Sequence, residues 1–256
     1  MKTLTRFLIA LFAGAILALT SFAGPEPIRD YKDSKDKVIA PVPEPCNWQG
    51  FYIGLNAGGT FGNSDATDID GYNGPNGNRW SYNTSGFVGG LEAGYNLQHW
   101  KHIVLGVEGD VGYLGSNGHG AQPGSPDHDT IGTTNDGLYT TFRGRVGVAF
   151  NHVLIYATGG GILANSDVGV FDHRDVRPAG DGFGDGSSDE VRLGWTVGGG
   201  MAYAINCHWS VKLEYLYYNL GRERFTFRQV NNNPFDTDFD TKTDGHIVRA
   251  GLDFKF

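Results

Sequence analysis

The chain has 256 residues, a formal net charge of −8, 40 glycines, 13% aromatic residues and two cysteines. The negative charge argues against a nucleic-acid-binding protein, and two cysteines are too few for a scaffold built on disulfides. Glycine is about twice as frequent as in an average soluble domain, and together with the aromatic content this favours an all-β protein of an oxidising or envelope compartment.

Residues 1–23 have the features of a cleaved secretory signal peptide. Lys2 and Arg6 precede an apolar run over 7–19, and Ser21 and Ala23 supply the small residues that signal peptidase reads. The apolar run is shorter than the ~20 residues that a membrane-spanning helix needs. We expect the mature chain to begin near Gly24, which removes two cations and takes the net charge from −8 to −10.

Residues 24–47 are rich in proline and charge and predict an exposed periplasmic linker. From Trp48 onward, apolar and polar residues alternate, as they do in β-strands. Eight such segments are predicted, at 50–62, 85–98, 102–115, 137–150, 152–164, 191–205, 208–220 and 245–256.

The connections between these segments alternate in length. Tight turns alternate with long polar segments at 63–84, 116–136, 165–190 and 221–244. Short turns at one end and long loops at the other are the layout of an outer-membrane barrel. The sequence therefore predicts an all-β fold, an eight-stranded antiparallel up-and-down transmembrane β-barrel over residues 48–256, with short periplasmic turns and four long extracellular loops.

The alternation places charge on one face of each strand and large apolar side chains on the other. In GLYTTFRGRVGVAF, residues 137–150, Arg143 and Arg145 lie opposite Phe142, Val146 and Val148. A soluble sandwich or a lipocalin-like cup would put the apolar face inside, whereas a membrane barrel puts the charged face in the lumen. The predicted lumenal charge ladder is Glu92, Glu108, Asp110, Arg143, Arg145, Arg192, Lys212, Glu214, Arg249, Asp253 and Lys255.

These charges are nearly balanced, five acids against six bases, as a narrow interior requires because an unpaired buried charge is costly. Glu108 and Asp110 have the same two-residue spacing as Arg143 and Arg145 on the next predicted strand, with the opposite sign. We expect these two pairs of side chains to interact across the strands.

Several segments together resemble a known family. Examples are WQGFYIGLNAG (48–58), GFVGGLEAGYNLQ (86–98), WSVKLEYLYYNLG (209–221) and HIVRAGLDFKF (246–256). They are similar to the Brucella/Rhizobium-type small outer-membrane proteins of alphaproteobacteria, within the OmpA-like eight-stranded barrels. The resemblance implies a porin-family envelope protein associated with lipopolysaccharide, whose terminal Phe256 assists recognition by the barrel-assembly machinery. Some relatives bind haemin.

Histidines and carboxylates raise the question of an enzyme or a metal site. His246 is predicted to face lipid near the extracellular end, with Thr241, Thr243 and Asp244 nearby, but the spacing positions no nucleophile. The other histidines map to turns and loops, and a metal site would need several of them to converge. We therefore expect no enzyme activity, no catalytic or metal residues and no cofactor. The acidic loop at 165–190 is either an ordinary solvated surface loop or a surface that bridges divalent cations to lipopolysaccharide.

Cys46 precedes the first strand and Cys207 lies in the turn before the seventh, so both are predicted at the periplasmic rim. In an oxidising compartment they could form a disulfide. The leading functional hypothesis is a non-enzymatic envelope protein that displays surface loops. The alternatives are a small-solute porin and a surface receptor for haemin or a host component.

Overall fold

The structure, a computed structural model, describes residues 46–71, 75–99, 102–123, 130–172, 184–229 and 237–256. The predicted signal peptide and most of the predicted linker lie outside these residues, as do parts of all four loops. The described residues contain no helix that could cross a membrane.

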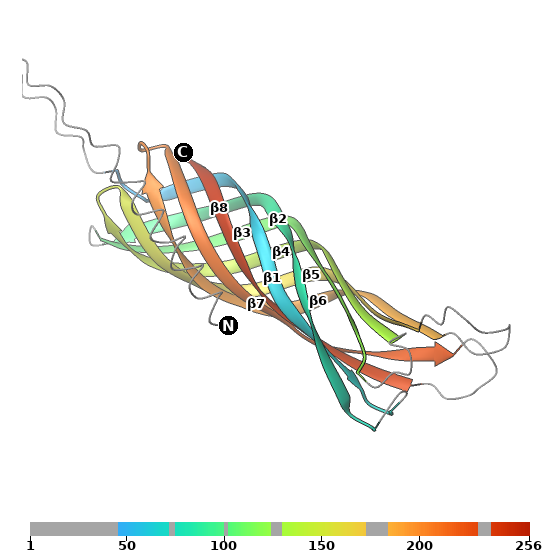
Figure 1. Cartoon of the computed structure of the whole chain (residues 1–256). Helices are drawn as coiled ribbons and strands as arrows, with labels where there is room; N and C mark the ends of the chain where they lie inside the picture. The colour runs from blue at the N-terminus through green and yellow to red at the C-terminus, as the bar shows by residue number, and fades with distance from the viewer. Residues whose placement is uncertain (1–45, 72–74, 100–101, 124–129, 173–183, 230–236) are drawn as a thin grey trace, which may run out of the picture. The chain divides into compact units, whose positions relative to one another are not determined.

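The described chain forms one closed antiparallel barrel, in which each strand pairs with its sequence neighbours and β1 pairs with β8. Figure 1 shows the strands winding obliquely around the barrel. The strands are β1 (Gly50–Asp68), β2 (Asn78–His99), β3 (Ile103–Ala121), β4 (Thr130–Phe150), β5 (Val153–Asp172), β6 (Gly184–Ala204), β7 (Trp209–Gln229) and β8 (Thr237–Lys255). The predicted fold class is correct.

The strands are longer than predicted, almost entirely on the extracellular side. For example, β1 continues to Asp68 instead of ending at 62, and β2 begins at Asn78 instead of 85. The added residues are polar on their outward face, for example Asp65, Thr67 and Ser81. Without an apolar outer face they show no apolar–polar alternation, and the pattern therefore predicts loops there.

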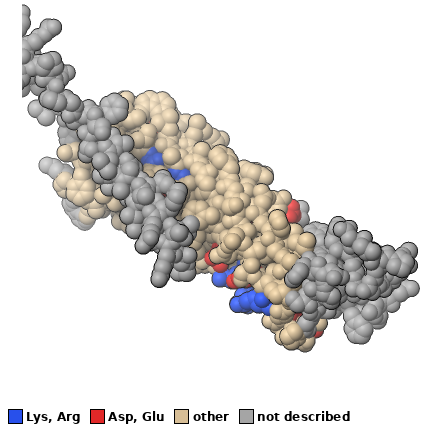
Figure 2. Space-filling model, in the orientation of Figure 1, with Lys and Arg blue, Asp and Glu red and all other residues tan. Residues whose placement is uncertain are grey.

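The outer wall of the barrel carries the large apolar side chains. Phe142 and Leu193 are 71% and 73% exposed, and all residues of this kind alternate with buried ones along their strands. The apolar run on β4 extends from Leu138 to Phe150. A run of that length spans about 30 Å when the strand is tilted, which matches the hydrocarbon thickness of a bilayer. Figure 2 shows a largely uncharged wall, with Lys, Arg, Asp and Glu toward the two ends.

The lumen is packed in layers along the barrel axis. An apolar cluster around Trp48 and Leu154 fills the periplasmic end, and the charged layer follows. A second apolar layer includes Leu114, Tyr139 and Ile247. Above it lies a polar layer with Asp136, Arg192, Ser64, Thr134 and Thr243, and then a third apolar cluster that contains Trp80, Val168 and Phe239. The strand register produces this layering, because it places inward residues of neighbouring strands at similar heights along the barrel axis.

Candidate functional site: an ion-paired lumen closed at its periplasmic end

Arg143 occupies the centre of the charged layer. Its Nη2 lies 2.5 Å from Glu108 Oε1 and 2.8 Å from Asp110 Oδ2, and its Nη1 lies 3.2 Å from Glu214 Oε2. Its Nε donates to Thr141 Oγ1 at 3.1 Å. Arg143 is fully buried, so one guanidinium joins carboxylates from β3 and β7 across the lumen. Such charge-assisted bonds are the strong form of hydrogen bond.

Arg145 is held by two tyrosine rings as well as by an ion pair. Its guanidinium carbon lies 5.0 Å from the centre of the Tyr52 ring and 4.8 Å from that of Tyr156. Its Nη1 lies 3.1 Å from Glu108 Oε2. The same Glu108 oxygen accepts a hydrogen bond from Tyr52 Oη at 2.6 Å. Because cation–π contacts are stronger where water is excluded, these rings help to offset the desolvation of Arg145.

Lys212 and Arg249 complete the network from β7 and β8. Lys212 Nζ lies 2.6 Å from Glu92 Oε1 and 3.0 Å from Glu108 Oε2. Arg249 Nη2 lies 2.6 Å from Glu214 Oε2 and 3.2 Å from Asp110 Oδ2. The Coulombic interactions are therefore shared among many partners, and each carboxylate named here contacts at least one cation.

Two glycines make room for the tyrosines that enter this layer. A Cβ atom on Gly94 would lie 2.2 Å from Tyr52 Oη, and one on Gly200 would lie 2.8 Å from Tyr156 Oη. The narrow lumen of an eight-stranded barrel can hold large side chains only if facing positions are small. Glycine at these positions therefore has a packing reason rather than a conformational one.

Of the eleven predicted ladder residues, ten are buried in the lumen and one is not. Lys255 lies half-buried at the periplasmic rim, where its Nζ donates to the backbone oxygen of Asn47. Lys255 keeps the inward phase, since it lies opposite Tyr52, but it stands at the mouth of the barrel and is not part of the charged layer.

Arg192 is lumenal but belongs to the polar layer nearer the cell surface. It donates to Thr243 Oγ1 at 3.1 Å and to the backbone oxygen of Gly221 at 3.1 Å. Without Arg192 and Lys255, the charged layer contains five acids and four bases, not the predicted five and six. The strand register places Arg192 at a different height from the other charges. Alternation alone predicts the face on which a residue lies but not its height in the lumen.

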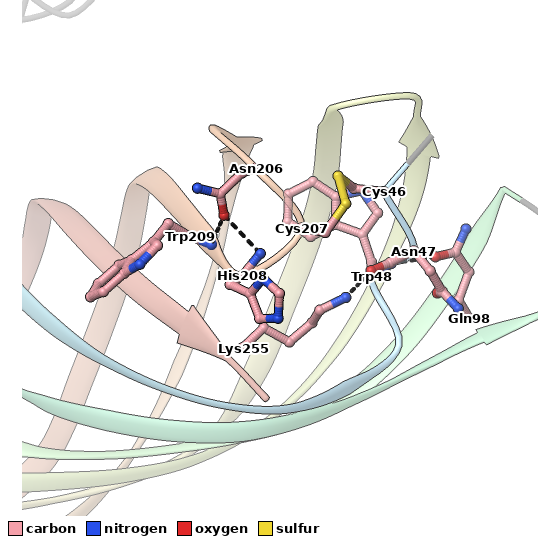
Figure 3. Close-up of a disulfide and its surroundings, with 9 residues drawn as sticks. All are labelled: Cys46, Asn47, Trp48, Gln98, Asn206, Cys207, His208, Trp209 and Lys255. Atoms are coloured by element: carbon pink, nitrogen blue, oxygen red, sulfur yellow. Dashed lines mark hydrogen bonds between the residues drawn. A yellow bond between two sulfur atoms is a disulfide. The ribbon is translucent and has the colours of Figure 1, made fainter. Parts of the chain in front are cut away.

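The periplasmic mouth is closed by the segment that precedes β1. Trp48 and Cys46 are buried against inward side chains of the strand ends, including Ala149 and Leu154. Trp48 N donates to Gln98 Oε1 at 2.6 Å. The structure joins Cys46 to Cys207, and Figure 3 shows this disulfide beside the Trp48 ring.

The turn that carries Cys207 is itself fixed by hydrogen bonds. Asn206 Oδ1 accepts from the backbone nitrogens of His208 and Trp209, at 2.9 and 2.8 Å (Figure 3). The disulfide therefore connects the segment to a rigid turn, which keeps Trp48 in the mouth of the barrel.

Reducing the disulfide will lower the stability of the barrel without opening its strands. A bond that closes a long loop contributes roughly 2–4 kcal/mol. We expect dithiothreitol to lower the urea midpoint of unfolding, followed by the heat-modifiable shift in gel mobility. The doubly substituted variant Cys46→Ser, Cys207→Ser should show the lower midpoint with or without reductant. Equal midpoints for the native protein in both conditions would contradict the bond.

His246 faces outward, as predicted, and Asp244 lies on the same face of β8, but the two threonines named with it do not. Its Nδ1 lies 2.7 Å from Tyr215 Oη, and its ring stacks on Phe61 at 5.5 Å. Thr241 and Thr243 are buried in the lumen, on the opposite side of β8. Hence neither threonine hydroxyl can be activated by His246.

The predicted acidic loop lies largely outside the described residues, so the structure does not test it as a cation-binding surface. Among the described residues, no three His, Cys, Asp or Glu side chains are grouped as metal ligands would be.

A family model described as the outer membrane protein beta-barrel domain matches residues 38–256. The chain belongs to this outer-membrane β-barrel family. It is accordingly a protein of the bacterial outer membrane.

Proteins with similar sequences occur in Brucella and Rhizobium, the two genera named in the predicted resemblance. The 31 kDa outer-membrane immunogenic protein of Brucella melitensis is 35% identical over 227 residues, covering 85% of this chain and 87% of that protein. The 22 kDa outer membrane protein of Rhizobium leguminosarum is 32% identical, covering 85% and 82%. Among solved structures, outer membrane protein OprG of Pseudomonas aeruginosa is 12% identical with a TM-score of 0.47, covering 81% and 96%. The predicted Brucella/Rhizobium resemblance is confirmed.

Sequence reasoning did not name Tyr52, Tyr139 and Tyr156 among the lumenal residues, nor Trp48 as a buried residue. Tyr52, Tyr139 and Tyr156 hydrogen-bond to or stack on the buried charges. The alternation could have identified these tyrosines, because each of them stands between two outward-facing residues. No pattern marked Trp48 as buried, since it precedes the first strand.

Proposed function

We propose that this protein is a non-enzymatic, non-conducting structural component of the outer membrane that displays its extracellular segments at the cell surface. The observation that supports this role most strongly is the packing of the lumen. A water-filled channel would expose the side chains that line it, yet Arg143, Arg249, Leu114 and Tyr218 are at most 1% exposed.

The obstruction is present in several successive layers. The cluster around Trp48 lies at the periplasmic mouth, and the third apolar cluster lies at the other end. Beyond that cluster, Gln122 Nε2 donates to Asp68 Oδ2 at 3.1 Å, and both residues are fully buried. Opening a small-solute path would require breaking buried ion pairs and displacing apolar layers together, which is energetically unfavourable.

Planar-bilayer recording tests this proposal. We expect no steady ion-selective conductance from the refolded protein, while a general porin reconstituted in the same way conducts. Insertion is verified by the heat-modifiable gel shift of protein recovered from vesicles of the same composition. Unitary conductance steps of constant size, with a total current that scales with the amount of inserted protein, would overturn the non-conducting role.

The proposal also concerns assembly and lipid partners. The terminal Phe256 is 67% exposed, and its ring packs at 5.2 Å against Phe254 and at 5.8 Å against Phe51. An exposed terminal aromatic of this kind supports a role as the signal for the barrel-assembly machinery. Outer-membrane lipid and lipopolysaccharide surround the wall, and divalent cations bridge acidic extracellular segments to the lipopolysaccharide.

A further inference from the structure

Outward-facing asparagines form a ring around the barrel at the upper edge of its apolar wall. They occur on six of the eight strands, and a seventh strand has Asp244 at the same level. Every outward-facing asparagine in the described strands belongs to this ring. Its members are Asn63, Asn83, Asn117, Asn135, Asn165 and Asn219.

The strand register shows that these residues share one level. Asn63 lies directly opposite Asn83, and Asn117 lies opposite Asn135. Asp244 lies opposite both Asn63 and Asn219, which closes the ring between β7, β8 and β1. Between β2 and β3 the ring is offset by two residues, because Asn117 lies opposite Ser85 and not Asn83. Between β4 and β5 it is offset by two residues again, because Asn135 lies opposite Asp167 and not Asn165. Offsets in one direction are expected where tilted strands form a level ring.

The ring lies where the membrane changes from hydrocarbon to headgroups. The outward residues directly below it are mostly apolar or aromatic, such as Phe61, Leu138 and Leu163, with Ser85 below Asn83 as an exception. Above it the outward residues are polar or charged, including Asp65, Arg222 and Arg224. The periplasmic edge of the apolar wall has aromatic residues instead, for example Phe150, Tyr203 and Trp209. The two membrane surfaces are therefore marked by different chemistry.

The asparagines have no structural explanation within the barrel. Asparagine is depleted in β-strands, so six at one level run against local propensity. Within the described residues, the side chains of Asn63, Asn83, Asn135 and Asn165 make no hydrogen bonds, and all four are exposed. Asn117 and Asn219 each make one bond, to backbone atoms of Gly115 and Gly221.

We propose that this asparagine ring binds the saccharide headgroups of the glycolipid in the outer leaflet. Each amide has a donor and an acceptor, which suits sugar hydroxyls, and it carries no charge that would require a counter-ion at the hydrocarbon edge. Phosphate groups would instead select arginine or lysine, and these lie further from the apolar wall. The inference depends on the outer-membrane location and not on whether the lumen conducts.

Vesicle reconstitution tests the ring. The protein is refolded into phosphatidylethanolamine–phosphatidylglycerol vesicles with or without lipopolysaccharide, and its unfolding temperature is read from the heat-modifiable gel shift. We expect lipopolysaccharide to raise this temperature in the native protein. The variant Asn63→Ala, Asn83→Ala, Asn135→Ala, Asn165→Ala should lose most of that increase and keep its unfolding temperature in plain phospholipid.

Two controls separate this effect from general damage. Asn151→Gly removes an asparagine at the periplasmic end, where its φ of 51° suits glycine, and should keep the full increase. Replacing the same four residues with glutamine retains the amides and should keep part of the increase. If the fourfold alanine variant fails to fold, Asn63→Ala, Asn83→Ala and Asn135→Ala, Asn165→Ala are compared as two pairs.

A further arm identifies the recognised group. Dephosphorylated lipopolysaccharide should still raise the unfolding temperature of the native protein more than that of the alanine variant, whereas free oligosaccharide at the same sugar concentration should not. An equal increase in both proteins, or loss of the difference on dephosphorylation, would overturn the proposal. A conducting barrel that still shows the asparagine-dependent increase would refute only the proposed non-conducting role.

Discussion

Replacing Arg143 with methionine will destabilise the folded barrel by about 3–5 kcal/mol, because the substitution leaves buried carboxylates without their shared partner. Arg143 contacts Glu108, Asp110 and Glu214 and is fully buried. Methionine is a flexible apolar side chain of comparable volume, so a cavity contributes less to the loss than the unpaired carboxylates do. The free energy is measured from urea-dependent folding in detergent micelles, followed by gel mobility and tryptophan fluorescence.

Arg224→Met is the matched control for this substitution. Arg224 also lies on a strand near an acid, 4.0 Å from Asp240, but its side chain is 62% exposed. Ion pairs in contact with water contribute less than about 1 kcal/mol. If Arg143→Met costs no more than Arg224→Met, the lumenal network does not stabilise the barrel.

The strand pattern could be predicted because a membrane barrel repeats a simple physical rule. Lipid contacts one face of every strand, so the outward residues had to be apolar from Phe51 on β1 to Phe254 on β8. The same rule placed Glu108 and Arg143 inside, and the register sets them directly opposite each other. Where lipid no longer contacts the strand, as at Asp65 or Ser81, this constraint ends and so does the pattern.

The contacts within the lumen could not be predicted in the same way. Alternation gives the face of a residue but not its height, so Arg192 and Arg143 seemed equivalent although an apolar layer separates them. The height depends on register, bulges and shear, which are properties of the closed sheet. Bulges near Tyr113 and Asp136 shift the pairing within single strands, and no local sequence signal marked them.

The asparagine ring illustrates the same limit. Five of the six asparagines fell within predicted loops, Asn63 and Asn165 as first residues, and Asn219 fell within a predicted strand. Their common level became visible only when the pairs Asn63–Asn83 and Asn117–Asn135 were set by the register. Features that depend on several strands at once therefore require the closed barrel.

Substituting Lys212 and Glu92 together will cost less than the sum of the single substitutions. Lys212 Nζ lies 2.6 Å from Glu92 Oε1, and both side chains are at most 1% exposed. Lys212→Met should cost about 3–5 kcal/mol, since Glu92 then keeps Asn56 Nδ2 at 2.9 Å but its remaining cation, Arg249, lies 3.9 Å away. Adding Glu92→Gln removes the uncompensated charge and should recover about 1–3 kcal/mol as coupling energy.

The exposed pair Lys242–Asp244 supplies the comparison for this double-mutant cycle. Its atoms are also close, at 3.1 Å, but the two side chains are 36% and 23% exposed. The cycle of Lys242→Met with Asp244→Asn should therefore give a coupling energy below about 1 kcal/mol. Glu108 retains Arg143 and Arg145 when Lys212 is lost, so the larger coupling should be specific to Glu92. Strict additivity of Lys212→Met and Glu92→Gln would show that the lumenal charges act independently, against the shared network that the distances indicate.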